Sequence, residues 1–367
     1  MKTFTVTFHH TCNYGAVLQA YSLHRTLRRM GHENTVMEYP DRGRFYCRIS
    51  ANPKNAARAL CMNCLRFCRK KELMQLERSF LEFRQNRMQL SRVYATTEDL
   101  RRDPPEAECL IAGSDQVWKM AGEPSRLASR FLDFGDDKVK RISYAASIEA
   151  LNYTEEQKEQ VRGWLSRFDA ISLREQSAAD YIAEITGRQD VVRVLDPVFL
   201  QTRQQWLEIA KKPRIRGPYI LCYQVQSNKR MQEVADRLKK QTGYPVVAIC
   251  NSEIRHIRAD HSLHDVSPEE FLGLYNEASI VVSASFHGTA FGLLFGKPTY
   301  GLTRNNYANR IREILEQFGL ERFCIGATDP IPVPQIDEEA LEEALNRERT
   351  ASLNYLENNL KGDNCEN

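Results

Sequence analysis

The sequence of 367 residues contains no apolar run of the roughly 20 residues that a bilayer-spanning helix needs. Its opening, MKTFTVTFHH, is not followed by an apolar stretch and a small-residue cleavage site, so we expect no signal peptide. The net charge is only +3, which gives no support for nucleic-acid binding. These absences predict a cytoplasmic protein that meets a membrane at most peripherally.

Several cofactor and catalytic motifs are also missing. GxGxxG and GxxxxGK[ST] are absent, which removes the main support for a dinucleotide site or a P-loop, and GxSxG is absent too. Three of the ten cysteines, Cys61, Cys64 and Cys68, share one helical spacing, with Cys47 upstream. No second C-x-x-C or histidine pair lies nearby, so we favour a thiol-lined packing face and expect no metal.

The chain instead alternates strand and helix patterns. Residues 3–8 favour a strand, residues 17–30 an amphipathic helix closed by Gly31, and residues 35–39 a second strand. Such a β-α-β opening predicts an α/β fold with parallel sheets and right-handed crossovers.

The composition also divides the chain. Residues 212–218 hold two prolines, one glycine and three charges, which is typical of a linker. We expect an N-terminal α/β domain at 1–212 with a basic helical insert at about 41–92. A C-terminal α/β domain at 213–367 would carry the SFHG turn and end in a long helix. A cleft between two such domains is the usual place for a ligand.

Two helix starts are marked locally. Thr154 with Gln157 fits a capping box, so a helix should begin directly after Thr154. Ser267 followed by Pro268 and two glutamates combines an N-cap residue with proline at the first helical position.

The stretch from 280 to 302, IVVSASFHGTAFGLLFGKPTYGL, predicts a strand, a tight turn, a short helix and a second strand. The turn holds Ser285, His287, Gly288 and Thr289. Parallel sheets bind ligands at the carboxyl ends of their strands, and helix N-termini suit phosphates and carboxylates. His287 would add a proton or a charge there. The alternative is that Gly288 makes the turn and His287 only faces solvent or bonds a carbonyl.

Polar residues follow other predicted strands as well. Asn13 and Gln19 offer hydrogen bonds to sugar hydroxyls, and Gly15 suits a turn whose amides hold an anion. The alternative is an ordinary turn capped by Asn13. Arg174 follows a later strand, where a guanidinium can bind a carboxylate or phosphate through two hydrogen bonds, or pair with Glu175.

The segment GSDQVW follows a further strand. Asp115 could accept the proton of a hydroxyl, Trp118 could stack on a sugar ring, and Ser114 and Gln116 offer hydrogen bonds. The alternative is a helix start capped by Ser114 or Asp115.

Seven motifs occur in a fixed order along the chain: NYGAVLQAYSL, LIAGSDQVW, FLDFG, KRISYAAS, FDAISLRE, DPVFL and SFHGTAFGLLFGKP. With these motifs in this order, the sequence resembles the polysaccharide pyruvyl transferase family. The resemblance extends from the first strand to about Leu320. It implies a glycosyltransferase-B-like fold of two Rossmann-like domains facing a cleft. It also implies transfer of the enolpyruvyl unit of phosphoenolpyruvate to a sugar of a cell-surface or exopolysaccharide precursor, with a pyruvate ketal and phosphate as products.

The resemblance further implies residue roles. Arg174 and His287 match the family's basic phosphoenolpyruvate-binding positions, and Arg310 occupies a third. We assign His287 as general acid or phosphate ligand, Arg174 as anion clamp and Asp115 as acceptor-side base. Phosphoenolpyruvate is the donor substrate, and no cofactor is expected. The residues expected to bind substrate are Asn13, Gly15, Gln19, Ser114, Gln116, Ser285, Gly288, Thr289 and Arg310.

Other readings stay open. His9 and His10, after the first strand, are alternative proton donors. A nucleotide-sugar glycosyltransferase of the same fold is a second candidate function, weakened because Phe291–Phe295 offers no acidic residue to bind a ribose. A non-catalytic scaffold in glycan assembly is a third. The acceptor saccharide could be lipid-linked, and the basic stretch Arg58–Lys71 could meet an anionic membrane or pack on its own domain. The oligomeric state is open.

Overall fold

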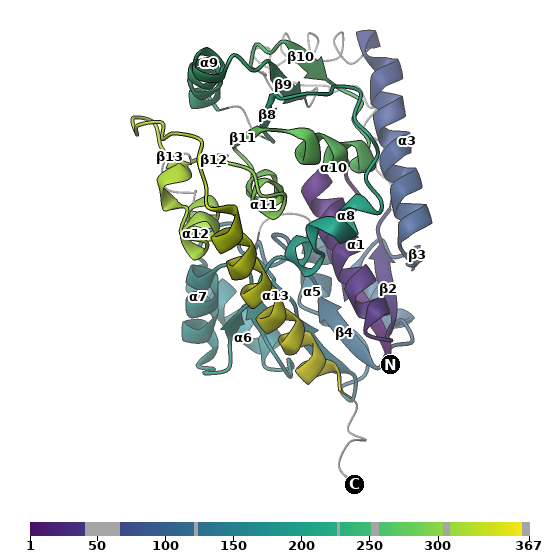
Figure 1. Ribbon diagram of the computed structural model, residues 1–367. Coiled ribbons are helices and arrows are strands. Elements are labelled where there is room, and N and C mark those ends of the chain that lie inside the picture. Colours follow the sequence, from purple (N-terminus) through teal and green to yellow (C-terminus); the bar gives the residue numbers. More distant parts are fainter. Residues whose placement is uncertain (41–66, 121–123, 226–227, 251–256, 304–308, 362–367) are drawn as a thin grey trace, which may run out of the picture. The chain divides into compact units, whose positions relative to one another are not determined.

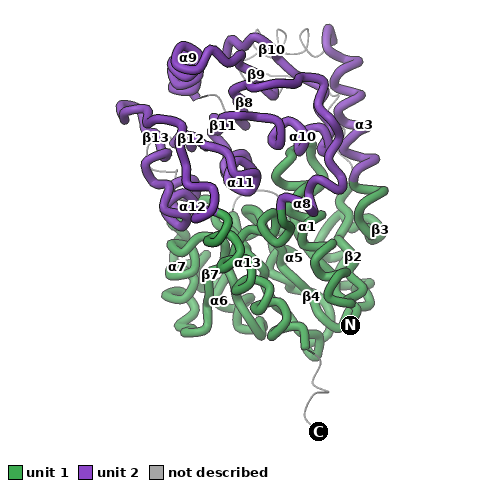
Figure 2. Tube along the Cα trace, in the orientation of Figure 1, with its two compact units in different colours: residues 1–40, 84–202, 342–367 green, residues 41–83, 203–341 purple. Residues whose placement is uncertain are grey.

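The computed structural model describes residues 1–40, 67–120, 124–225, 228–250, 257–303 and 309–361 (Figure 1). The chain forms two compact units. Unit 1 comprises Met1–Pro40, Arg84–Thr202 and Glu342–Asn367, and unit 2 comprises Asp41–Phe83 and Arg203–Leu341 (Figure 2). The crossing after Thr202 lies near the expected boundary at 212. The C-terminal segment, however, belongs to unit 1, because Leu356 and Leu360 are buried in that unit's core.

Unit 1 is built on a parallel sheet of strand order β3-β2-β1-β4-β5. Its strands are β1 (Lys2–Val6), β2 (Glu33–Glu38), β3 (Leu90–Val93), β4 (Cys109–Ala112) and β5 (Lys140–Ser143). Two short parallel strands, β6 (Ser172–Leu173) and β7 (Val192–Arg193), follow next to β5. Parallel bridges join Ile142 of β5 to Ala170, just before β6, and Ala146, after β5, to Leu173 of β6. Strands β1 and β4 are neighbours, and the chain leaves them in opposite directions, which makes their carboxyl ends a topological switch point.

Helices cover both faces of this sheet. Along β4, Cys109 and Ile111 pack with α1 (Tyr14–Arg29) and α13 (Glu338–Leu360), whereas Leu110 and Ala112 pack on the other side. That second side is covered by α4 (Thr97–Arg102), α6 (Glu155–Leu165) and α7 (Gln176–Thr186). Alternate residues of the buried strand therefore serve two separate cores.

Unit 2 repeats the plan with the order β10-β9-β8-β11-β12-β13, again fully parallel. The strands are β8 (Ile220–Tyr223), β9 (Val246–Ile249), β10 (His261–Leu263), β11 (Ile280–Ser283), β12 (Thr299–Leu302) and β13 (Cys324–Ile325). Its helices are α8 (Arg203–Leu207), α9 (Arg230–Thr242), α10 (Pro268–Glu277), α11 (Phe286–Leu294) and α12 (Asn309–Gln317). Here the switch point lies between β8 and β11.

The local helix signals are confirmed. Thr154 caps α6 in a complete capping box with Gln157, and Ser267 accepts a hydrogen bond from the Glu270 amide ahead of Pro268. The insert expected at about 41–92 is helical in α3 (Lys70–Arg87), but its end is wrong. Residues 90–93 form the edge strand β3, because their backbone pairs with β2. Residues 41–66 lie outside the described part. No helix of the described residues is long and apolar enough to cross a bilayer.

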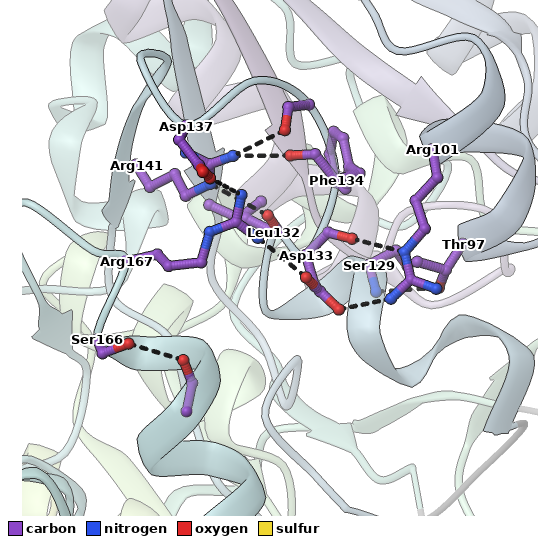
Figure 3. A network of polar contacts seen from close by, with 12 residues as sticks. Thr97, Arg101, Ser129, Leu132, Asp133, Phe134, Asp137, Arg141, Ser166 and Arg167 are labelled. Atoms are coloured by element: carbon purple, nitrogen blue, oxygen red, sulfur yellow. Dashed lines mark hydrogen bonds and ion pairs between the residues drawn. The ribbon is translucent and has the colours of Figure 1, made fainter.

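The FLDFG segment is held by one buried arginine. Arg141 on β5 donates hydrogen bonds to the carbonyls of Phe134 at 2.9 Å, Asp136 at 3.0 Å and Val139 at 2.8 Å (Figure 3). The Asp133 carboxylate pairs with Arg101 and Arg167 in the same network. This network fixes the loop that follows α5 (Leu127–Arg130).

Candidate active site

His287 is the second residue of α11, directly after β11 at the switch point of unit 2. It is 7% exposed, and its ring lies edge-on to that of Phe286 at 5.2 Å between centroids. Ser285 occupies the N-cap position with an extended backbone but makes no capping hydrogen bond through its side chain to the described residues. The first turn of α11 therefore presents a histidine and helix N-terminal amides at the sheet's carboxyl edge, a combination suited to an anion.

Gly288 allows α11 to approach the strand ends closely. A Cβ atom at this position would lie 2.2 Å from Ser283 Oγ, 2.7 Å from Tyr223 Cδ1 and 3.1 Å from the Tyr275 hydroxyl. Ser283 in turn bonds the Ser285 amide and carbonyl, each at 3.1 Å. The expected turn at Gly288 is thus a close backbone approach at the start of a helix, and it fixes where His287 sits.

The other predicted residues of unit 2 divide into two kinds. Thr289 is fully buried and donates its hydroxyl to the Ser285 carbonyl at 3.0 Å, so it holds the turn together. Arg310 is half-buried at the start of α12, a helix that packs against α11 and β12. Structure therefore brings Arg310 onto the helix next to the one that carries His287.

In unit 1, the residues predicted in the first turn have structural partners. Asn13 caps α1 by accepting the Ala16 amide at 3.3 Å, as the alternative reading of the sequence had it. Gln19 is fully buried, and its amide nitrogen lies 2.8 Å from Thr7 Oγ1 and 3.0 Å from the Phe8 carbonyl oxygen. Gly15 is buried in the first turn of α1.

Asp115 and Gln116 are half-buried at the carboxyl end of β4. Asp115 has φ of 71°, and its carboxylate accepts the Gln116 amide at 2.9 Å. Ala145, after the neighbouring strand β5, also has positive φ, at 53°. Backbone strain of this kind in non-glycine residues costs roughly 1–3 kcal/mol and concentrates at functional sites. The expected stacking of Trp118 on a sugar is wrong, because its ring is fully buried and stacks on Phe131.

Arg174 is the centre of a buried ion network. Its Nε donates to Glu175 at 2.8 Å, its Nη1 to Asp196 at 2.7 Å and its Nη2 to the Ser147 hydroxyl at 3.1 Å. Ser114 donates its hydroxyl to the same Asp196 oxygen at 2.9 Å. The clamp role expected of Arg174 does not fit this geometry, since its Nε, Nη1 and Nη2 are all bonded to two protein carboxylates and a hydroxyl.

The charges of this network favour a neutral or cationic ligand over an anion. Burial lowers the pKa of Arg174, but the carboxylates of Glu175, Asp196 and Asp115 outweigh burial and raise it overall. One guanidinium thus faces three carboxylates. Glu175 is 4% exposed, and its Oε2 has no hydrogen-bond partner among the described residues. This edge of unit 1 therefore has one unmatched carboxylate oxygen, an acceptor of the kind that suits a sugar hydroxyl.

His9 is excluded as a proton donor. It is fully buried, its Nε2 lies 2.7 Å from the Met37 carbonyl oxygen, and burial lowers its pKa to about 3. A histidine of that pKa is neutral and holds its single proton toward Met37 at neutral pH. His10 is half-buried with its ring 4.6 Å from that of Tyr39.

Sequence reasoning missed two of the three partners of Arg174. Glu175 is its neighbour in FDAISLRE, but Ser147 and Asp196 lie 27 and 22 residues away along the chain, so no local pattern connects them to it. Cys61 and Cys64 lie outside the described residues, and Cys68 is exposed. Within the described ranges, no group of three or more His, Cys, Asp or Glu side chains is placed to hold a metal ion.

Two parallel Rossmann-like sheets with site residues at their carboxyl edges define an α/β protein of the glycosyltransferase-B-like class. Of the solved structures that match, UDP-GlcNAc 2-epimerase of Methanocaldococcus jannaschii has a TM-score of 0.51 at 10% identity, over 94% of this chain and 92% of that one. The Neisseria meningitidis UDP-GlcNAc 2-epimerase bound to UDP-GlcNAc has a TM-score of 0.46 at 12% identity, over 100% of this chain and 95% of that one. A glycosyltransferase from Streptomyces sp. SF2575 has a TM-score of 0.38 at 14% identity, over 97% of this chain and 96% of that one. At these identities the likeness to the first concerns the fold alone.

The sequence also identifies one family within that class. The family model for polysaccharide pyruvyl transferases matches residues 13–306, so the chain belongs to the polysaccharide pyruvyl transferase family. No curated protein matches the sequence. The matched range includes His287, Arg174 and Asp115, and Arg310 lies just beyond its end.

Proposed function

We propose that this protein transfers the enolpyruvyl unit of phosphoenolpyruvate to two hydroxyls of a saccharide, forming a cyclic pyruvate ketal and releasing phosphate. The observation that carries the proposal is His287 in the first turn of α11, within the range that matches the family. We further propose that the saccharide is a cell-surface or exopolysaccharide precursor. The reaction would take place in the cytoplasm, peripherally at the membrane where the acceptor is lipid-linked.

The chemistry asks for a proton donor and a place for an anion. His287 as imidazolium would protonate the methylene carbon of phosphoenolpyruvate, which leaves an oxocarbenium-like centre at C2. One sugar hydroxyl adds to C2 and loses its proton, the C2–O bond to phosphate breaks, and the second hydroxyl closes the ketal while its proton leaves with phosphate. The amides at the start of α11, with Arg310 on α12, would balance the charge of phosphate and carboxylate. This scheme draws on no metal or cofactor.

On the acceptor side, Asp115 would accept a hydroxyl proton, because its half-buried carboxylate lies at the carboxyl end of β4. Glu175 and Gln116 would offer further hydrogen bonds. Arg174 acts as a positioning residue, since its ion pairs hold Glu175 and Asp196 beside Ser114.

The testing experiment measures binding and turnover together. Phosphoenolpyruvate should raise the melting temperature of the full chain, and His287→Gln should lower turnover more than tenfold. His261→Gln is the matched control, because His261 is an exposed histidine of unit 2 on β10. A thermal shift with nucleotide sugars but not with phosphoenolpyruvate would instead identify a glycosyltransferase. Unchanged function in His287→Gln would favour a non-catalytic scaffold.

A further inference from the structure

Among the buried arginines of unit 1 that have no carboxylate partner in the described residues, two contact the same segment at the edge of the sheet. Arg84, near the end of α3, is 6% exposed, and its Nη1 donates to the His9 carbonyl at 3.4 Å. The Nε of Arg84 has no hydrogen-bond partner among the described residues. Arg130, the last residue of α5, is also 6% exposed and donates to the carbonyl oxygens of Lys119 at 3.1 Å and Arg126 at 3.5 Å.

Both arginines lie at one edge of the sheet. Arg84 contacts His9, which follows β1, and the Arg130 guanidinium carbon is 5.6 Å from the ring centre of Phe8 in the same segment. Tyr39, directly after β2, joins them, because its ring is 5.9 Å from that of His9 and its pKa is influenced by Arg130. These are the carboxyl ends of parallel strands, where α/β sheets bind ligands.

The energetics of this cluster point to a missing anion. Burial lowers the pKa of Arg130 overall; Tyr39 partly offsets this by raising it, and Arg126 lowers it further. Burial raises the pKa of Tyr39 to about 12, so the phenol keeps its proton, and its hydroxyl has no partner among the described residues. A buried guanidinium is costly to a fold unless its donors are matched, as those of Arg141 are by carbonyl oxygens at Nε, Nη1 and Nη2. Arg84 differs, because its Nε has no acceptor among the described residues.

We propose that Arg84 and Arg130 bind a phosphate-type anion, with Tyr39 as a further hydrogen-bond donor. Two guanidinium forks match the oxygens and the roughly double negative charge of a phosphate ester or diphosphate better than a single carboxylate. The group belongs either to phosphoenolpyruvate or to a phosphate that links the acceptor saccharide to its carrier. Both sources rest on the proposed function, whereas the anion site itself does not. The second source agrees with the carboxylate-rich cluster around Arg174 on the same edge, which suits sugar hydroxyls.

The position of Arg130 is fixed before any ligand arrives. Trp118 donates its indole N–H to the Arg130 carbonyl at 3.2 Å, and Thr97 accepts the amide of Ser129 at 3.1 Å. The Arg141 network holds the loop that follows (Figure 3). Such fixed donors bind an anion without first having to be ordered.

The test titrates the full chain with inorganic pyrophosphate by calorimetry. Arg84→Gln and Arg130→Gln should each weaken binding at least tenfold, whereas Arg87→Gln should bind like the wild type. Arg87 is the matched control, because it lies on the same helix, carries the same charge and is exposed. Arg84→Lys and Arg130→Lys keep the positive charge but lose the planar guanidinium with its paired donors, and they should bind pyrophosphate at least threefold more weakly than the wild type. These lysine variants carry the test where a glutamine variant does not fold.

A second titration distinguishes the two sources. If pyrophosphate still binds in saturating phosphoenolpyruvate, the site serves the acceptor's phosphate. If the two compete and Arg84→Gln weakens both equally, it serves the donor. Arginine-dependent pyrophosphate binding without any phosphoenolpyruvate binding would support this site and count only against the proposed function. Wild-type pyrophosphate affinity in the four arginine variants, or an equal loss in Arg87→Gln, would overturn the proposal.

Discussion

Replacing Arg174 by methionine should destabilise unit 1 strongly. The substitution leaves the Glu175 and Asp196 carboxylates, 4% and 0% exposed as side chains, without the guanidinium that contacts them at 2.8 and 2.7 Å. Removing one partner of a buried ion pair costs about 3–5 kcal/mol. With an m-value of about 2 kcal/mol/M, the midpoint of urea unfolding should fall by about 2 M.

A rescue variant and a surface control make this result specific. Asp196→Asn on the Arg174→Met background removes one stranded charge and keeps an acceptor oxygen for Ser114, so it should restore part of the loss. Arg78→Met, which breaks an exposed pair with Glu82, should change the midpoint little. If Arg174→Met unfolds like the wild type and has lost only phosphoenolpyruvate binding, Arg174 is the ligand clamp that the sequence predicts. Our account of the network would then be wrong.

Two further perturbations test the close packing and the buried histidine. Gly288→Ala should lower the free energy of unfolding by about 1–3 kcal/mol and lower turnover, because the added methyl group would overlap Ser283 Oγ. Its control, Gly163→Ala on the open face of α6, should raise the free energy of unfolding by about 0.4–1 kcal/mol. Equal midpoints of urea unfolding in the two variants would contradict this. The pKa of His9 is lowered from 6.5 to about 3, so the unfolded state takes up its proton first, and stability is full above pH 6.5 and falls as the pH drops toward 3. Between about pH 7.5 and 5 the wild type should lose about 2 kcal/mol through His9. His9→Gln should lose that much less, and an unchanged pH slope would show that His9 is not buried neutral.

Much of the fold follows from short-range patterns. The β-α-β opening, the capping box at Thr154 and the Ser267-Pro268 helix start are confirmed, because each depends on residues within one or two turns of each other. The SFHG turn is placed at the end of a strand and the start of a helix, as expected. The edge strand β3 is missed, because its pairing is with β2, more than fifty residues earlier.

The candidate site divides in the same way. Its location at strand ends is readable from the sequence, since parallel strands bring their carboxyl ends to one edge. The role of each side chain at that edge is not readable from the sequence. The motif around Arg174 predicts an anion ligand, but in the folded chain Asp196 and Ser147 bind its guanidinium.

Short-range patterns therefore predict the β-α-β opening, two helix starts and the family, because these rest on local hydrogen bonding, periodicity and motif order. Which buried charges are paired depends instead on contacts between residues far apart in the sequence. Arg174 meets its carboxylates, whereas Arg84 and Arg130, distant in sequence, contact the same Phe8–His9 segment without one in the described part of the chain. The reason is physical, because the energy of a buried charge depends on what surrounds it in space.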